Sequence, residues 1–149
     1  MLIISQSMTN RTSLPRAELF LCEDIRFEAN DKHTLVGVFG GSTIEASVKR
    51  NEKTTPVMPI LAVYVRLHGL EGENGMELSL TDPNGRELGR QTSAVRKLVA
   101  TAPTNVIAKF SPFPIIPGTF RILSKFGETS IESTFEMVVK YDQSADAAD

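Results

Sequence analysis

The fold class is decided by the stretch FRILSKFGETSIESTFEMVVKY, which runs from Phe120 to Tyr141. In residues 120–126 and again in residues 131–137, apolar and polar side chains largely alternate, which is the period of a β-strand. The segment 127–130 between them begins with Gly127, a residue type that accepts the backbone of tight turns. The stretch therefore predicts an antiparallel β-hairpin with one apolar and one charged face.

The same alternation predicts a register for the hairpin. A loop over residues 127–130 brings apolar residues opposite each other on one face and opposite charges together on the other. The predicted pairs are Phe126 with Ile131, Ile122 with Phe135, Phe120 with Met137, Lys125 with Glu132, and Arg121 with Glu136. Each pair contributes roughly 0.2–1 kcal/mol. An exchange of Arg121 and Ile122 between the faces would contradict this register, because a one-residue slip turns every side chain over.

The rest of the chain also reads as short strands separated by turns. Strands are expected at residues 17–22, 25–28, 34–39, 60–67, 76–81 and 104–110. The strand at 17–22 carries apolar residues on both parities, which indicates burial on both faces or a change of sheet. The turn Asp82-Pro83-Asn84-Gly85 suits a three-residue hairpin loop with a bulge, which would place Leu80 opposite Leu88 and Asp82 opposite Arg86. Residues 93–100 fit either a short helix or an irregular strand.

These elements predict an all-β fold. We expect an antiparallel two-sheet sandwich of the immunoglobulin-like type, with about seven to nine strands and at most one short helix. The β-sandwich domain is expected over residues 16–142. Residues 1–15 are interpreted as an N-terminal arm, and residues 143–149 as a disordered acidic tail.

Composition excludes several classes of protein. With 149 residues the chain suits one domain, and its net charge of −2 gives no overall attraction to nucleic acid. Its single cysteine, Cys22, excludes an internal disulfide framework and zinc sites built from paired cysteines. No apolar run is long enough for a transmembrane helix, and the start lacks the pattern of a signal peptide. We therefore expect a cytoplasmic protein.

Two stretches resemble a family of small uncharacterised bacterial proteins. The first is Cys22-Glu23-Asp24-Ile25-Arg26-Phe27-Glu28, and the second is Lys32-His33-Thr34-Leu35-Val36-Gly37-Val38-Phe39-Gly40. The strand beginning Pro59-Ile60-Leu61 and the segment Ser111-Pro112-Phe113 before Pro117-Gly118 are similar to it as well. The likeness covers about residues 17–141. It implies a β-sandwich and no assigned activity.

The candidates for catalysis are few. Cys22 and His33 could lie on neighbouring strands, and a nucleophile needs such a base beside it. The adjacent Glu23 and Asp24 would raise the pKa of the Cys22 thiol, whereas a reactive cysteine needs an electropositive setting. A buried cysteine that acts as a small hydrophobe is the alternative. Cys22, Glu23, Asp24 and His33 are therefore weak candidates for a site at the loop end, and no catalytic residue is assigned.

Ligand classes are narrowed in the same way. Two isolated histidines cannot form a three-ligand zinc site without carboxylates from distant loops. The acidic set Glu23, Asp24, Glu28 and Asp31 lacks the close spacing of a calcium loop. The chain contains neither a nucleotide-binding glycine motif nor tryptophan, and this composition does not favour nucleic acid or carbohydrate. We expect no metal and no cofactor.

The proline-rich strip at residues 110–117 is the leading candidate for an interaction surface. Its prolines cannot complete a strand ladder, so the strip is expected at a sheet edge. Phe113 and Ile115 either fill the core or join Phe110, Pro112 and Ile116 in an exposed apolar patch for a partner. The sequence thus favours a non-catalytic module that binds another protein or itself. Self-association would give a homodimer. The alternatives are an enzyme with a loop-end ligand or metal site, and a mobile-element protein that blocks a host complex.

Overall fold

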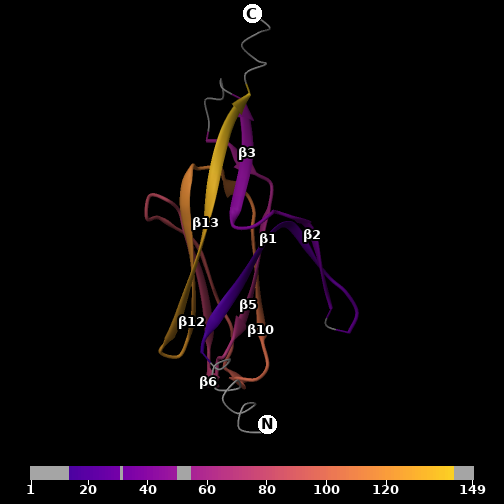
Figure 1. The fold of residues 1–149 in the computed structure, drawn as a ribbon, viewed down its shortest axis with the longest axis vertical. Coiled ribbons are helices and arrows are strands. Elements are labelled where there is room, and N and C mark those ends of the chain that lie inside the picture. Colours follow the sequence, from indigo (N-terminus) through magenta and orange to yellow (C-terminus); the bar gives the residue numbers. More distant parts are fainter. Residues whose placement is uncertain (1–13, 31, 50–54, 143–149) are drawn as a thin grey trace, which may run out of the picture.

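The computed structural model describes residues 14–30, 32–49 and 55–142, and over these residues the chain is all-β (Figure 1). The predicted acidic tail, residues 1–13 of the predicted arm, and Asp31 lie outside the described residues. No helix occurs in the described ranges, so residues 93–100 take the irregular-strand alternative and not the helical one. In particular, the described part of the chain holds no helix with the length and apolarity needed to cross a bilayer.

Most of the longer strands show the alternating or continuous apolar patterns expected from the sequence, and short polar strands accompany them. They are β1 (Arg16–Phe27), β2 (His33–Val38), β3 (Thr43–Lys49), β4 (Val57–Met58), β5 (Leu61–His68), β6 (Gly72–Asn74), β7 (Met76–Thr81), β8 (Glu87–Thr92), β9 (Arg96–Leu98), β10 (Thr104–Phe110), β11 (Phe113–Pro114), β12 (Gly118–Phe126) and β13 (Thr129–Asp142). All six expected segments have strand structure, but residues 17–22 and 25–28 belong to the single strand β1. The segment that forms β3 was not predicted as a strand.

Two larger sheets organise the molecule. One is four-stranded in the order β10-β5-β1-β2, and the other is five-stranded in the order β3-β13-β12-β7-β8. Two small ladders, β11-β4 and β6-β9, accompany them. Strands β1 and β13 run along the long axis, and the start of β1 and the end of β13 lie at opposite ends of it (Figure 1).

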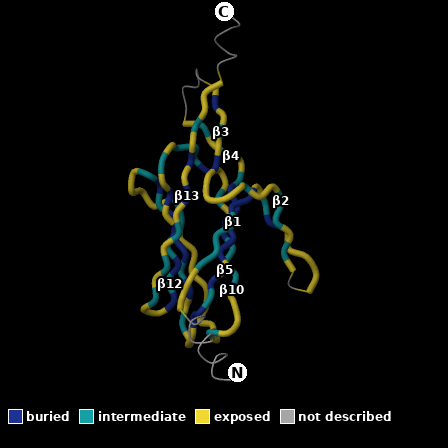
Figure 2. The backbone as a smooth tube through the Cα atoms, in the orientation of Figure 1, coloured by how far each residue is buried: buried dark blue, intermediate teal, exposed yellow. Residues whose placement is uncertain are grey.

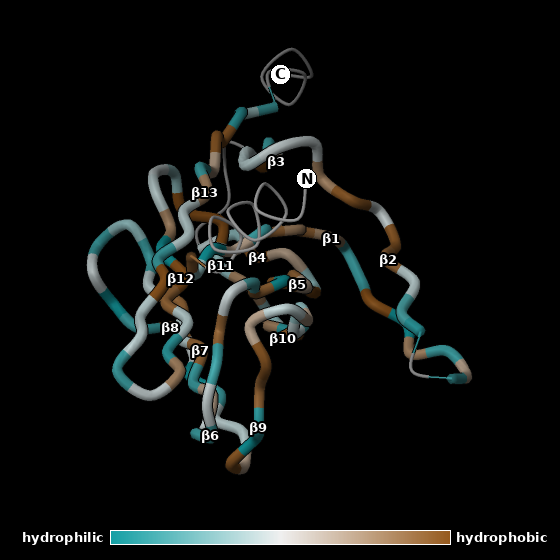
Figure 3. The backbone as a smooth tube through the Cα atoms, turned by 60° about the horizontal axis from the view of Figure 1, so that its bottom comes forward, coloured by the Kyte–Doolittle hydropathy of each residue, from teal (hydrophilic) through white to brown (hydrophobic). Residues whose placement is uncertain are grey.

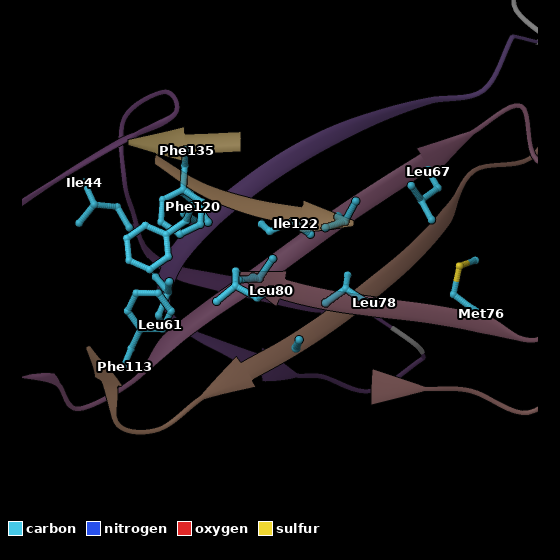
Figure 4. Packing of buried hydrophobic residues seen from close by; sticks show 14 of the residues in the cluster. Ile44, Leu61, Leu67, Met76, Leu78, Leu80, Phe113, Phe120, Ile122 and Phe135 are labelled. Atoms are coloured by element: carbon cyan, nitrogen blue, oxygen red, sulfur yellow. The ribbon is translucent and has the colours of Figure 1, made fainter. Parts of the chain in front are cut away.

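Both larger sheets contribute to one hydrophobic core. Leu61, Val63 and Val65 of β5 lie in the same buried cluster as Leu78 and Leu80 of β7. Figure 4 shows Phe113, Phe120 and Phe135 gathered at one end of this cluster. The buried positions follow the facing strands of both sheets, whereas the loops and the β1–β2 end are mostly exposed (Figure 2).

The hairpin of β12 and β13 exists, but its register differs from the predicted one by two residues. Phe120 lies opposite Phe135 and Phe126 opposite Thr129, so the loop contains only Gly127 and Glu128. The φ of Gly127 is +60°, in the left-handed region and outside the range of a β-strand. A glycine with positive φ at the first position suits a two-residue turn of type II′, which is shorter than the predicted loop.

The predicted apolar and charged faces of the hairpin are unchanged, because a shift of two residues leaves every side chain on its predicted face. Ile122 is fully buried and Arg121 is exposed. The charge pairs change, however. Lys125 faces Ser130, and Arg121 lies 3.7 Å from Glu132 in place of the predicted Glu136.

Two further register predictions are partly corrected. The turn at residues 82–85 is the predicted three-residue loop, since the N–H of Asp82 donates to the carbonyl of Arg86 at 2.8 Å. Leu80, however, lies opposite Gly89 because a bulge follows it. The expectation of purely antiparallel sheets is wrong for one pair, as β13 and β3 run parallel.

Ser124 on β12 places a hydroxyl in the core. Its side chain is 3% exposed, and its Oγ has no hydrogen-bond partner among the described residues. Burial of an unpaired hydroxyl costs roughly 1–3 kcal/mol, so the substitution Ser124→Ala is expected to raise the free energy of unfolding by about 1 kcal/mol. Urea unfolding followed by circular dichroism measures this change. Ser130→Ala, at an exposed position opposite Lys125, is the control and should be neutral; a loss of stability in Ser124→Ala would contradict the assignment.

Candidate interaction surface

The outer face of the four-stranded sheet carries a second apolar cluster, separate from the main core. It contains Cys22, Ile25, Ala62 and Tyr64, with Phe20, Leu35 and Ile107 packed against them. This face exists because β1 and β5 are apolar on both parities, so each strand buries side chains on both sides of the sheet. In the ladder, Tyr64 lies between Ile107 of β10 and Phe20 of β1.

The β1–β2 hairpin continues past the point where β1 stops pairing with β5, and we call its residues 24–30 and 32–36 the arm. β1 pairs with β5 only as far as Cys22, and from Asp24 onward its ladder partner is β2 alone. Figure 3 shows the arm projecting away from the remaining strands. Side chains of the arm nevertheless return to the outer face, since Ile25 and Leu35 belong to the same cluster as Tyr64.

Four rings join the arm to the sheet, and all of them meet edge to face. The ring centroids of His33 and Tyr64 lie 5.9 Å apart, and those of Phe20 and Tyr64 lie 6.0 Å apart. Phe27 packs on His33 at 5.2 Å with an interplanar angle of 86°. Such edge-to-face contacts are favourable and directional, and they fix the arm relative to the outer face.

Cationic side chains border these rings. The Nε of Arg66 donates a hydrogen bond to Oδ1 of Asn105 at 3.2 Å, and these two residues lie opposite each other on β5 and β10. The Nζ of Lys109 lies 2.9 Å from Oδ1 of Asp24 and 5.7 Å from the ring centroid of Phe27. The hydrogen bond from Lys109, together with that from the N–H of Ile25, lowers the pKa of the Asp24 carboxyl.

Two hollows on this surface adjoin at His33, and we call them together the groove. The larger, of about 650 Å³, is lined by Phe27, His33, Arg96, Pro103, Thr104, Asn105 and Ile107. The smaller, of about 210 Å³, is lined by Phe20, His33, Leu35, Tyr64 and Arg66. The groove therefore runs from the arm across β5 to the beginning of β10.

The weak catalytic candidates do not form one site. Cys22 and His33 lie on neighbouring strands as expected, but Cys22 faces Val38 while His33 faces Phe27. Five ladder positions separate them, which is roughly 16 Å at 3.3 Å per residue. Cys22 is fully buried, and its Sγ contacts the carbonyl of Ala62 at 3.7 Å. Burial, and then the charge of Asp24, raise the pKa of its thiol.

The two acidic residues beside Cys22, Glu23 and Asp24, each contact neighbouring residues of the fold. Asp24 is paired with Lys109, and the side chain of Glu23 lies over Gly37, whose φ is +63°. Among the described residues, no group of three or more histidine, cysteine, aspartate or glutamate side chains could hold a metal ion. Asp31, a member of the predicted acidic set, lies outside the described residues.

The proline-rich strip is largely part of the core. Phe113 is fully buried and packs near Phe120 and Phe135, which agrees with the core-filling alternative. Phe110, Ile115 and Ile116 are half-buried against the same core. Of the five predicted contact residues, Pro112 alone is exposed. The strip thus offers little free apolar surface, and the binding role predicted for it stays a prediction.

The groove was missed by the sequence analysis, although part of its signal was readable. Apolar residues occupy both odd and even positions in residues 17–22 and 60–67, which indicates apolar side chains on both faces of the sheet. Phe20 and Tyr64 lie on the outer of these faces. The folding of the arm over that face depends on the point where β1 leaves β5. Arg96 and Asn105 come from separate segments, so no local pattern could bring them together.

Comparison with models of known protein families finds no match for this chain. Comparison with curated proteins finds no significant match either. The functional argument therefore rests on the residues of the groove.

Proposed function

We propose that this chain is a non-catalytic β-sandwich that binds a protein partner, or a second copy of itself, through the outer face of its four-stranded sheet. The single observation that carries the proposal is the groove, in which aromatic, aliphatic and cationic side chains are gathered in a concave surface. Interfaces are enriched in aromatic residues and arginine, and energetic hot spots concentrate in such concave sites. The shared core of the two larger sheets supports the sandwich, with the parallel β13–β3 pair as a departure from the immunoglobulin-like pattern.

A photo-crosslinking experiment tests the proposal. Benzoylphenylalanine placed at Ile107, in the groove, is expected to form a reproducible protein adduct in cells of the source organism. The same group at Thr134, exposed on the outer face of the five-stranded sheet, is the matched control. An adduct at Ile107 that disappears in the Phe27→Ala variant supports the proposal, whether the adduct is another protein or a second copy. Equal adducts at both positions, or none at Ile107, would contradict it.

The alternative of a cysteine-dependent enzyme makes an opposite prediction for Cys22. Because the thiol is buried and its pKa is raised, a thiol reagent at pH 8 is expected to modify native Cys22 at least about 100-fold more slowly than the urea-unfolded chain. The release of thionitrobenzoate measures both rates. Raising the pH should increase the native rate, since thiolate accumulates as the pH approaches the raised pKa. Rapid modification of the native protein would revive the enzymatic alternative.

A further inference from the structure

The lining of the groove is unusual in its charge. The chain as a whole carries a net charge of −2, yet the described lining of the groove contains Arg66, Arg96 and His33 and no carboxylate. Glu18, opposite Arg66 in the ladder, interacts electrostatically with Arg66 but does not line either hollow. Elsewhere on the described surface several cations are paired with acids, as Arg90 is with Glu77 and Glu87. Within the described ranges, no carboxylate lies at ion-pair distance from Arg96. The groove therefore presents positive charge that its own lining does not balance.

The guanidinium groups of Arg66 and Arg96 have N–H donors that are available for a ligand. Arg66 uses its Nε for Asn105, and a guanidinium has five N–H donors in a planar fork that matches a carboxylate. Glu18, its neighbour across the ladder, accepts a hydrogen bond from His68, whose Nε2 lies 2.5 Å from Oε1 of Glu18. The charge of the groove is thus complementary to carboxylates brought by a partner.

The geometry of the rings favours a peptide over a nucleic acid. Base stacking requires an open ring face. Here Tyr64 is only 8% exposed and is in edge-to-face contact with Phe20 and His33. The most exposed ring of the groove, Phe27, has Lys109 over one face and His33 against it. Rings that are already in contact with neighbours leave little open face for a base, and the aliphatic groups among them suit the side chains of a peptide.

The strand beside the groove is also an edge. β10 is the outermost strand of the four-stranded sheet in the described structure, and it supplies Thr104, Asn105 and Ile107 to the lining. A second hollow, lined by Gln91, Ser93, Arg96, Asn105 and Val106 among others, borders the same strand on the side of β8. The ring of Phe110 lies against Gly89 of β8 at one end of β10, so the hollow borders only the part of the strand around Asn105 and Val106. An extended segment bound there would meet main-chain groups of an edge strand, as in strand addition.

We propose that the groove binds an extended acidic segment of a partner protein, with carboxylates on Arg66 and Arg96 and an apolar side chain among the rings between them. This inference rests on the proposed function and specifies the chemistry of the partner. It assigns a role to Arg96, which has no ion pair among the described residues, and to the guanidinium N–H groups of Arg66 that Asn105 does not use.

A peptide-binding measurement tests the inference. The probe is a fluorescein-labelled nonapeptide in which aspartate alternates with leucine and valine, and its counterpart carries lysine in place of aspartate. Fluorescence anisotropy is expected to show binding of the acidic peptide with a dissociation constant below about 1 mM, and at least tenfold weaker binding of the basic one. The double variant R66E/R96E should weaken binding of the acidic peptide by about tenfold or more. Arg121→Glu, an exposed arginine on the other sheet, is the control and should leave binding unchanged.

Several outcomes would overturn the inference. They are equal binding of both peptides, equal weakening by Arg121→Glu, and tighter binding of a thymidine oligonucleotide than of the acidic peptide. Absence of binding at about 1 mM acidic peptide also overturns it. If this inference fails while the crosslink at Ile107 persists, the surface binds a partner of different chemistry and the proposed function stands.

Discussion

Replacement of Phe113 with alanine is expected to lower the free energy of unfolding by about 3–5 kcal/mol. The side chain is fully buried, and its ring centroid lies 5.2 Å from that of Phe120 and 6.4 Å from that of Phe135. Removal of the ring leaves a cavity at the end of the core that β11 closes, and close-packed neighbours fill such a space only in part. Against a typical stability of 5–15 kcal/mol, the loss is a large fraction of the total.

Urea unfolding followed by circular dichroism measures this effect. Phe27→Ala is the matched control, because Phe27 is 65% exposed and its removal should cost less than about 1 kcal/mol. Similar losses in the two variants would contradict the core position of Phe113. The comparison has a functional consequence, since lost binding in a Phe113 variant would reflect unfolding, whereas lost binding in the Phe27 variant would report on the groove.

Gly127→Val is expected to destabilise the protein by about 2–4 kcal/mol. The φ of Gly127 is +60°, and a β-branched residue there costs of order 1–3 kcal/mol in backbone strain. A Cβ at this position would also lie 2.8 Å from the side-chain nitrogen of Asn74 on β6, so that side chain must move. Steric strain of this kind adds roughly another 1–3 kcal/mol when the neighbour cannot move freely.

The thermal stabilities of Gly127→Val and Glu128→Val are compared. Both variants add a valine to the same turn, so a difference between them reports the backbone conformation at residue 127 and not the added hydrophobic side chain. Glu128 is the second, exposed residue of the same turn, and its φ is not positive. Its substitution should therefore change the stability by less than about 0.5 kcal/mol. Equal effects at the two positions would mean that the turn does not depend on the glycine, and with it the register of β12 and β13 would come into question.

The hairpin shows how far sequence patterns predict this fold. Alternation fixes which side chains share a face, and the buried Ile122 and exposed Arg121 confirm that part. Alternation cannot distinguish registers that differ by two residues, because both keep the faces intact. The turn decides between them, and the conformation of Gly127 selects the two-residue loop over the predicted four-residue loop.

Other errors arise where distant segments meet. β3 alternates Ile44, Ala46 and Val48 with polar residues, so its strand character was visible in the sequence. Its parallel partner, β13, lies almost a hundred residues away, and no local pattern encodes that pairing. The groove is similar, since it combines the arm with β5, β9 and β10. Phe20 and Tyr64 could be placed on a second face, but the charge around them depends on topology.

The orientation of β1 and β13 has a mechanical consequence. The start of β1 and the end of β13 lie at opposite ends of the long axis, and both strands run along that axis (Figure 1). Tension applied through these two ends would act parallel to the strands and load their ladder hydrogen bonds in shear. Bonds loaded in this way must break together, whereas bonds at a peeled edge break one after another. The domain is therefore arranged to resist being pulled apart along its chain while the outer face of its four-stranded sheet remains uncovered.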